Sequence, residues 1–189
     1  MADLCPPDDL SNLTRGVETD PGAQLGNLER LLERYPADAR LHFLHGSMLA
    51  TERRLIEAHR ALSKAVELAP DFAIARFQLG LFQLTSGEAA NALETWGRLD
   101  LLEDGHYLRS FVDGLRCLIR DDFAKAIEHL TLGIAQNTEN VPLSRDMNML
   151  IDRIRPLLTA PRSAPGDDTI SETSLILSQL GRPKGKLDS

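Results

Sequence analysis

The feature that most constrains this sequence is a repeat with a period of 34 residues. Three glycines, three alanines and three bulky apolar residues each recur at this spacing, always in the same order. The glycines are Gly46, Gly80 and Gly114, the alanines Ala58, Ala92 and Ala126, and the bulky residues Leu62, Trp96 and Leu130. A fixed period of this length predicts a stack of similar supersecondary units, each of which buries its apolar face against its neighbours.

Apolar residues within each repeat recur at helical spacing, which predicts two helices per repeat. The expected helices are 39–51 and 56–68, then 72–85 and 89–101, then 106–120 and 123–135. Small residues at the glycine and alanine positions would let the paired helices approach closely. Aromatic residues make up only 5% of the chain, which disfavours a β-sandwich or barrel. We therefore expect an all-α protein.

This pattern resembles the tetratricopeptide repeat (TPR) family. The matching residues are Gly46, Leu49, Ala58, Leu62, Ala65 and Pro70 in the first unit, Leu79, Gly80, Gly87, Ala92 and Trp96 in the second, and Gly114, Ala126 and Leu130 in the third. The family's early aromatic residue is absent from all three units, and its closing proline from the last two. The resemblance implies a right-handed superhelix of antiparallel helix pairs, with repeats at 39–72, 73–106 and 107–140.

The sequence on either side of the three repeats predicts further helices and two terminal segments. We expect a helical domain over 21–158, in which 25–34 is the second helix of a degenerate half-repeat and 142–155 is a capping helix. Residues 1–20 are expected to form a partly disordered arm, although 8–17 could supply the partner helix of that half-repeat. Residues 159–189 are rich in polar residues and predict a flexible tail with a possible short helix at 169–180.

The resemblance also implies a concave groove lined by the first helix of each pair. Its positions are occupied almost entirely by aliphatic and phenyl side chains: Phe43, Ile74, Phe77, Leu81, Leu84, Leu108, Phe111, Leu115 and Leu118. The basic residues that would clamp a C-terminal carboxylate are missing. An apolar groove suits an amphipathic or extended apolar peptide, which predicts a non-enzymatic protein-interaction adaptor. The alternative is that these residues are ordinary core, because the phase is shifted by one or the tail fills the groove.

Three other functions compete with the adaptor: a chaperone for a hydrophobic secretion substrate, a self-assembly module that uses the segment 170–180, and a metal or regulatory site at His42, His45 and His59. We expect a structural role for the histidines, since no acid or cysteine stands at a supporting spacing. No catalytic residue, cofactor or metal site is predicted.

Charge and hydropathy narrow the expected partners and location. The formal net charge of −7 argues against nucleic acid, and no apolar run approaches the roughly 18 residues of a membrane span. The N-terminus lacks a signal-peptide pattern, and two cysteines cannot build a disulfide framework. We therefore expect a cytoplasmic protein with a protein or peptide partner, no membrane insertion and a possible homo-oligomer.

Overall fold

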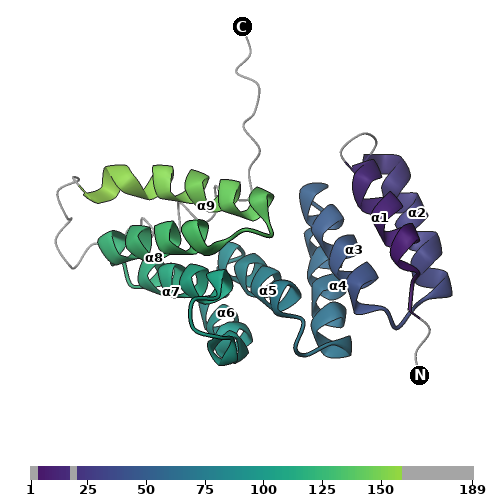
Figure 1. Cartoon of the computed structure of the whole chain (residues 1–189), viewed down its shortest axis with the longest axis horizontal. Helices are drawn as coiled ribbons and strands as arrows, with labels where there is room; N and C mark the ends of the chain where they lie inside the picture. The colour runs from purple at the N-terminus through teal and green to yellow at the C-terminus, as the bar shows by residue number, and fades with distance from the viewer. Residues whose placement is uncertain (1–3, 18–20, 159–189) are drawn as a thin grey trace, which may run out of the picture. The chain divides into compact units, whose positions relative to one another are not determined.

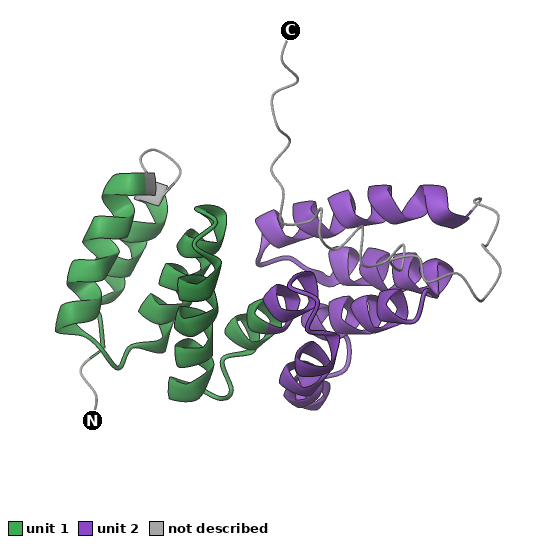
Figure 2. Cartoon of the chain, turned by 180° about the vertical axis from the view of Figure 1, so that it is seen from behind, with its two compact units in different colours: residues 1–79 green, residues 80–189 purple. Residues whose placement is uncertain are grey.

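Figure 1 shows the computed structural model of the protein, which describes residues 4–17 and 21–158. The regular elements in these two ranges are all helices, which confirms the all-α prediction. The predicted helix at 169–180 lies outside the described residues. The chain divides into two compact units, residues 1–79 and 80–189, and the boundary falls within one helix (Figure 2).

Unit 1 consists of successive helices that pack on one another in chain order. They are α1 (Pro7–Val17), α2 (Pro21–Arg34), α3 (Ala39–Thr51), α4 (Leu55–Leu68) and the first half of α5 (Ala73–Thr85). α1 packs on α2, α2 on α3, and α3 pairs closely with α4. Leu28, Leu41, Leu49 and Leu62 are completely buried and form part of this core. The expected partner helix of the N-terminal half-repeat therefore exists.

Unit 2 contains the second half of α5 and the remaining helices. These are α6 (Ala89–Trp96), the 3₁₀-helix η1 (Gly97–Leu101), α7 (Tyr107–Ile119), α8 (Phe123–Gln136), α9 (Val141–Ile154) and the 3₁₀-helix η2 (Arg155–Leu158). α7 pairs closely with α8, and α9 packs on α8. The apolar stripe of α9, Leu143, Met147, Leu150, Ile151 and Ile154, is buried as the capping-helix prediction requires.

The repeated glycines lie where the two helices of a pair come closest. A Cβ atom added to Gly46 would stand 2.6 Å from Cγ of Leu62, and one added to Gly114 would stand 2.7 Å from Cγ of Leu130. A Cβ atom at Gly80 would overlap the indole ring of Trp96. The glycine and the bulky residue that follows 16 positions later are thus direct contacts, which explains why both recur with the same period.

The turn inside each helix pair also repeats. Arg53, Gly87 and Asp121, spaced by 34 residues, adopt positive φ angles of 64°, 86° and 56°. In each turn the next residue donates its backbone N–H to a carbonyl five residues earlier: Arg54 to Leu49 at 3.0 Å, Glu88 to Gln83 at 2.8 Å, and Asp122 to Cys117 at 3.0 Å. This is the Schellman arrangement, which satisfies the last carbonyls of a helix.

Two element boundaries differ from the sequence prediction by more than one residue. α2 begins at Pro21 rather than at residue 25, because Pro21 stands at the first helical position that proline tolerates. The predicted helix at 89–101 is α-helical only to Trp96 and continues as η1, beginning at Gly97, a residue of low helix propensity. Among the described residues, no helix combines the length and apolarity needed to cross a lipid bilayer.

Candidate functional site

The predicted groove residues of α7 are buried within unit 2. Leu108 is 1% exposed, and Phe111, Leu115 and Leu118 are completely buried. The ring of Phe111 packs against Gly133 of α8 and lies edge-on to Tyr107 with ring centroids 5.8 Å apart. The expectation of an accessible apolar face on α7 is therefore not met. A helix that is apolar around most of its circumference is typically buried, and α7 buries nine of its thirteen residues.

α5 contributes both buried and accessible members of the predicted groove. Phe77 and Leu84 are 1% and 2% exposed, so these two side chains also lie in the interior. Ile74 in unit 1 and Leu81 in unit 2 are only partly buried and can be reached from solvent. Whether any of these side chains contacts a partner stays a prediction.

Unit 1 presents an apolar cluster at predicted groove positions. Phe43 of α3 is partly buried, and its ring lies edge-on to that of Phe72, with the two centroids 5.4 Å apart. Phe72 immediately precedes α5, and Ile74 follows in the first turn of that helix. The contact between Phe43 and Phe72 joins α3 to the residue before α5, and Ile74 lies two residues further along the chain. Each of the three keeps part of its surface in water, and we name them the unit 1 apolar cluster. The groove prediction omitted Phe72, although it begins the helix predicted at 72–85.

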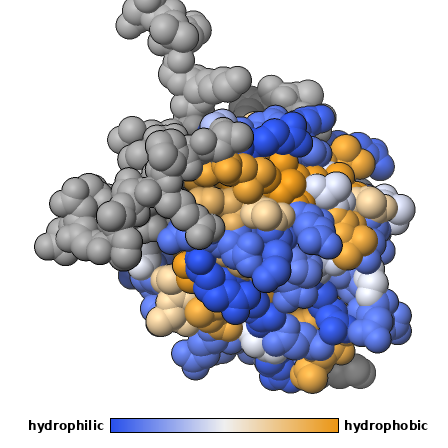
Figure 3. Space-filling view, turned by 90° about the vertical axis from the view of Figure 1, so that its left-hand side faces the viewer, coloured by the Kyte–Doolittle hydropathy of each residue, from blue (hydrophilic) through white to orange (hydrophobic). Residues whose placement is uncertain are grey.

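Unit 2 exposes other apolar side chains, which come from residues outside the predicted groove. Figure 3 shows apolar surface between hydrophilic residues on one face of the molecule. Among the described residues of unit 2, the large apolar side chains that remain exposed are Leu93, Leu101, Leu132, Val141, Met149 and Leu158. They are distributed over α6, η1, α8, α9 and η2. The accessible apolar surface of unit 2 is thus not the α7 face that the resemblance implied.

The histidines of unit 1 make separate contacts. Nε2 of His42 lies 2.8 Å from the carbonyl oxygen of Pro36, while Nε2 of His45 lies 3.8 Å from Oε1 of Glu29. Burial lowers the pKa of His45, and the nearby Glu29 carboxylate opposes this effect only in part. In the part of the chain that the structure describes, no three histidine, cysteine or acidic side chains are grouped so that they could hold a metal ion.

A buried carboxylate ties the N-terminal segment to α3, and sequence reasoning missed it. Asp38, only 1% exposed, accepts hydrogen bonds from the backbone N–H of Arg40 and of Cys5, both at 2.9 Å. Nη2 of Arg40 lies 2.6 Å from Oδ2 of Asp38 and also donates to the carbonyl oxygen of Cys5 at 2.9 Å. The only sequence signal was an N-cap aspartate directly before a predicted helix.

This network also determines the state of Cys5. Its thiol is 2% exposed, and burial, together with the carboxylates of Asp9 and Asp38, raises its pKa. A raised pKa favours the thiol over the thiolate, which is the nucleophilic form. Cys5 therefore has the surroundings of a structural cysteine.

Comparison with known proteins gives no further assignment. No family model matches the chain, and no curated protein matches it significantly.

Proposed function

We propose that this protein is a non-enzymatic, TPR-type adaptor that binds an apolar or amphipathic segment of a partner protein. The internal regularity of the helix pairs supports the TPR assignment. The glycine contact and the Schellman turn recur with the 34-residue period, and the antiparallel pairs would stack as a right-handed superhelix. A cytoplasmic location and a protein or peptide partner belong to the same proposal.

The observation that carries the proposed binding function is the unit 1 apolar cluster. Phe43 and Ile74 stand at positions that the family presents to ligands, and both keep accessible surface. Aromatic and aliphatic anchors that are partly buried in the free protein lose little conformational freedom when a partner covers them. An amphipathic helix that places two or three apolar residues on such a cluster is the simplest ligand of this chemistry.

The burial data change which residues the proposal relies on. Leu108, Phe111, Leu115 and Leu118 would have to leave the core of unit 2 before they could contact a ligand. A charged substitution at Leu115 would therefore test folding rather than binding. We accordingly base the proposal on Phe43 and Ile74 of unit 1 and treat Leu81, which belongs to unit 2, separately.

The test is a selection from a phage-displayed library of peptides, followed by binding measurements with the purified wild-type protein. We expect the selected peptides to carry apolar residues at i, i+3, i+4 or i+7. Ile74→Glu should weaken their binding by about tenfold or more, because it places a charge beneath the apolar side of the peptide. Ile56→Glu is the matched control, since Ile56 is 79% exposed and lies on α4 outside the predicted groove.

The circular dichroism of both variants must match that of the wild type before their binding is compared. The peptide binding of Leu81→Glu, measured in the same way, tests separately whether the unit 2 half of α5 contributes to binding. Equal peptide binding by Ile74→Glu and Ile56→Glu, with both folded, would refute the proposed surface. Selected peptides without an apolar pattern would refute the proposed ligand class.

A further inference from the structure

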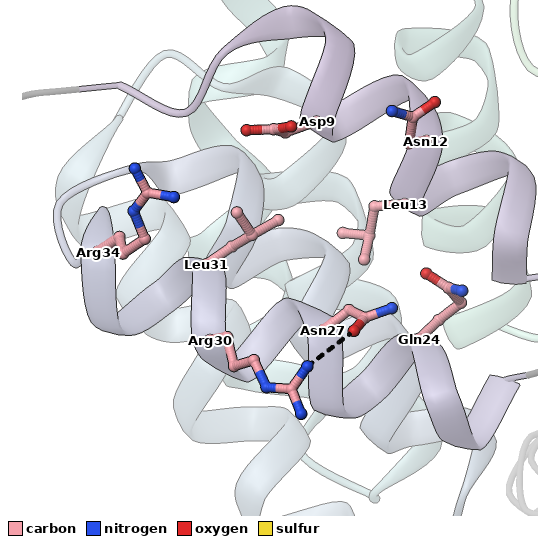
Figure 4. A pocket seen from close by; sticks show the side chains of 8 residues that line it. All are labelled: Asp9, Asn12, Leu13, Gln24, Asn27, Arg30, Leu31 and Arg34. Carbon is pink, nitrogen blue, oxygen red and sulfur yellow. Dashed lines mark hydrogen bonds between the residues drawn. The ribbon is translucent and has the colours of Figure 1, made fainter.

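The hollow between α1 and α2 of unit 1 has the lining of an ordinary protein surface (Figure 4). Asn12, Asn27, Arg30 and Arg34 are exposed to solvent, and Leu13 is already buried. These side chains need no ligand to explain them, whereas the burial of one side of α7 in unit 2 does need an explanation.

The first helices of successive pairs begin 34 residues apart, at Ala39, Ala73, Tyr107 and Val141. On each of these helices, residues at successive intervals of four, three and four positions lie along one side. On α7 the residues of this side are all apolar, and we name them the α7 stripe: Leu108, Val112, Leu115 and Ile119. The equivalent positions on α3, α5 and α9 are separated from them by multiples of the same period.

Among the four first helices, only α7 has this side closed to solvent. Leu108 is 1% exposed, and Val112 and Leu115 are completely buried. All four equivalent positions on α3, and all four on α5, keep accessible surface, and three of the four on α9 are exposed. Because these helices occupy the same place in the repeat, the neighbouring helices of the series do not by themselves close this side.

The other two sides of α7 have identified neighbours. Gly114 lies against Leu130 of α8. On a second side, Nη1 of Arg116 lies 2.7 Å from Oδ1 of Asp100 in η1. The α7 stripe is the third side of the helix, so its burial calls for a further contact of apolar character.

The chain beyond Leu158 supplies a segment of the required chemistry. Residues 170–180 contain five aliphatic side chains: Ile170, Leu175, Ile176, Leu177 and Leu180. η2, which ends at Leu158, packs on α8 and α9, so the chain leaves the described region next to the helix that pairs with α7. The residues between Leu158 and this segment span about 35–40 Å when extended, whereas α7 is about 20 Å long, so the segment can reach the whole stripe.

Arg153 of α9 provides a second observation in favour of the same occupant. Its Nη1 atom is buried and, within the part of the chain that the structure describes, has no hydrogen-bond partner. A buried guanidinium nitrogen without a partner is unfavourable, and a carboxylate is the strongest acceptor for it. Residues 163–172 contain no basic side chain and three acidic ones, Asp167, Asp168 and Glu172. The charge at the start of the apolar segment is thus complementary to Arg153.

We propose that residues 170–180 bind in cis to the α7 stripe of unit 2, with the acidic residues at the start of the segment directed toward Arg153. The covalent tether keeps the local concentration of the segment at about the millimolar level, so modest contacts are enough to keep the stripe closed. A partner protein can reach the stripe only when the segment leaves, which makes the segment a built-in competitor. This inference concerns unit 2 and does not depend on the unit 1 apolar cluster.

Paramagnetic relaxation in the full chain tests this contact. A nitroxide is attached through the substitution Ser178→Cys, and the two native cysteines, Cys5 and Cys117, are buried and should not compete for the label. Val112 is one of four valines in the chain and the only one on the α7 stripe, so a valine-labelled sample isolates its methyl signals. We expect the nitroxide to broaden the Val112 signals beyond detection, and ascorbate, which reduces the nitroxide, to restore them.

Two substitutions test which side chains make the contact. Leu177→Asp should lower the ratio of docked to free segment by about tenfold or more, because it places a charge against the apolar stripe, so the Val112 signals should stay visible beside the nitroxide. Leu187→Asp is the matched control, since it makes the same change outside the segment, and it should leave these signals broadened. The fluorescence of 8-anilinonaphthalene-1-sulfonate should rise with Leu177→Asp alone, because the stripe becomes accessible. The circular dichroism of both variants must match that of the wild type.

A mixed sample separates binding in cis from binding to a second copy. It contains valine-labelled chains without a nitroxide and unlabelled chains that carry one, and the Val112 signals should stay sharp. Broadening in this sample would assign the segment to a second copy and overturn the proposal. Val112 signals that remain visible beside the nitroxide in the Ser178→Cys chain, or equal behaviour of folded Leu177→Asp and Leu187→Asp, would overturn it as well.

The nitroxide measurement on the Ser178→Cys chain decides the proposal even if Leu177→Asp fails to fold. Ile74→Glu, which tests the unit 1 apolar cluster, should leave the Val112 signals unchanged. Failure of the proposed binding function and failure of the cis contact therefore give different outcomes.

Discussion

Replacement of Gly46 by alanine should destabilise unit 1, whereas the same replacement at Gly26 should stabilise it. Both glycines lie inside helices of unit 1, Gly26 in α2 and Gly46 in α3. A Cβ atom at Gly26 would meet nothing within 4 Å. A Cβ atom at Gly46 would stand 2.6 Å from Cγ of Leu62 and 3.0 Å from its backbone nitrogen.

The magnitude follows from two opposing terms. Alanine is favoured over glycine in a helix interior by about 0.8–1.0 kcal/mol, and this term acts at both sites. At Gly46 the added methyl group overpacks the contact with Leu62, which is completely buried and cannot move its backbone away. Overpacking of a core costs about 1–3 kcal/mol. Because the propensity terms cancel, the difference in the free energy of unfolding between the two variants measures the packing term, about 1–3 kcal/mol.

Urea unfolding followed by far-ultraviolet circular dichroism gives this difference. A double-mutant cycle with Leu62→Ala tests the cause. Leu62→Ala alone should cost about 2–5 kcal/mol, and in its background Gly46→Ala should cost less than in the wild type, because Cγ and Cδ2 of Leu62 are gone and only the backbone nitrogen still lies close. Equal stability of Gly46→Ala and Gly26→Ala, or a Gly46→Ala that is as destabilising in the Leu62→Ala background as in the wild type, would refute the close-approach explanation of the repeat.

Three further perturbations test other features by chemical or thermal unfolding. Arg53→Gly should stabilise unit 1 by about 0.5–1 kcal/mol, because Arg53 holds a φ of 64° that glycine adopts without strain. Gly87→Ala should destabilise unit 2, because alanine would be strained at the φ of 86° that Gly87 adopts. Asn137→Ala should cost about 1–3 kcal/mol, because Asn137 accepts the backbone N–H of Asn140 at 2.9 Å and donates to its carbonyl at 2.7 Å; unchanged stability would show that this loop is dispensable. Burial raises the pKa of Asp38, but its hydrogen bonds with Arg40 and Cys5 outweigh burial and hold the pKa below its ordinary value. The stabilisation that the charged form of Asp38 provides should therefore be complete above the unfolded-state pKa and be lost as the pH falls through the lowered folded-state pKa. The difference in stability between Asp38→Asn and wild type should accordingly shrink as the pH is lowered from 7 into the acid range.

The sequence was sufficient to predict the helix pairs because their signals are local and repeated. The first helix of the first repeat was predicted at 39–51 and is observed as Ala39–Thr51, and α8 differs from its prediction by one residue. Each pair carries its own glycine, its own bulky contact and its own turn, so three independent signals define the same boundaries. The change from α-helix to 3₁₀-helix after Trp96 has no comparable local signal.

The accessible surface was harder to predict than the helices. The groove prediction used the position of each residue within the repeat, but burial depends on what the surrounding chain covers. α7 illustrates the difference: the TPR resemblance predicted Leu108 and Leu115 at ligand-facing positions, and both are buried.

The burial of Trp96 provides an optical probe of unit 2 alone. It is the single tryptophan of the chain, it is completely buried, and it lies against Gly80 within the same unit. Emission excited at a wavelength that tyrosine does not absorb will follow the loss of structure around this indole, whereas circular dichroism follows the helices of both units. If the two signals change together in urea, the units unfold as one cooperative block; if they separate, the difference gives the stability of each unit without the chain being cut.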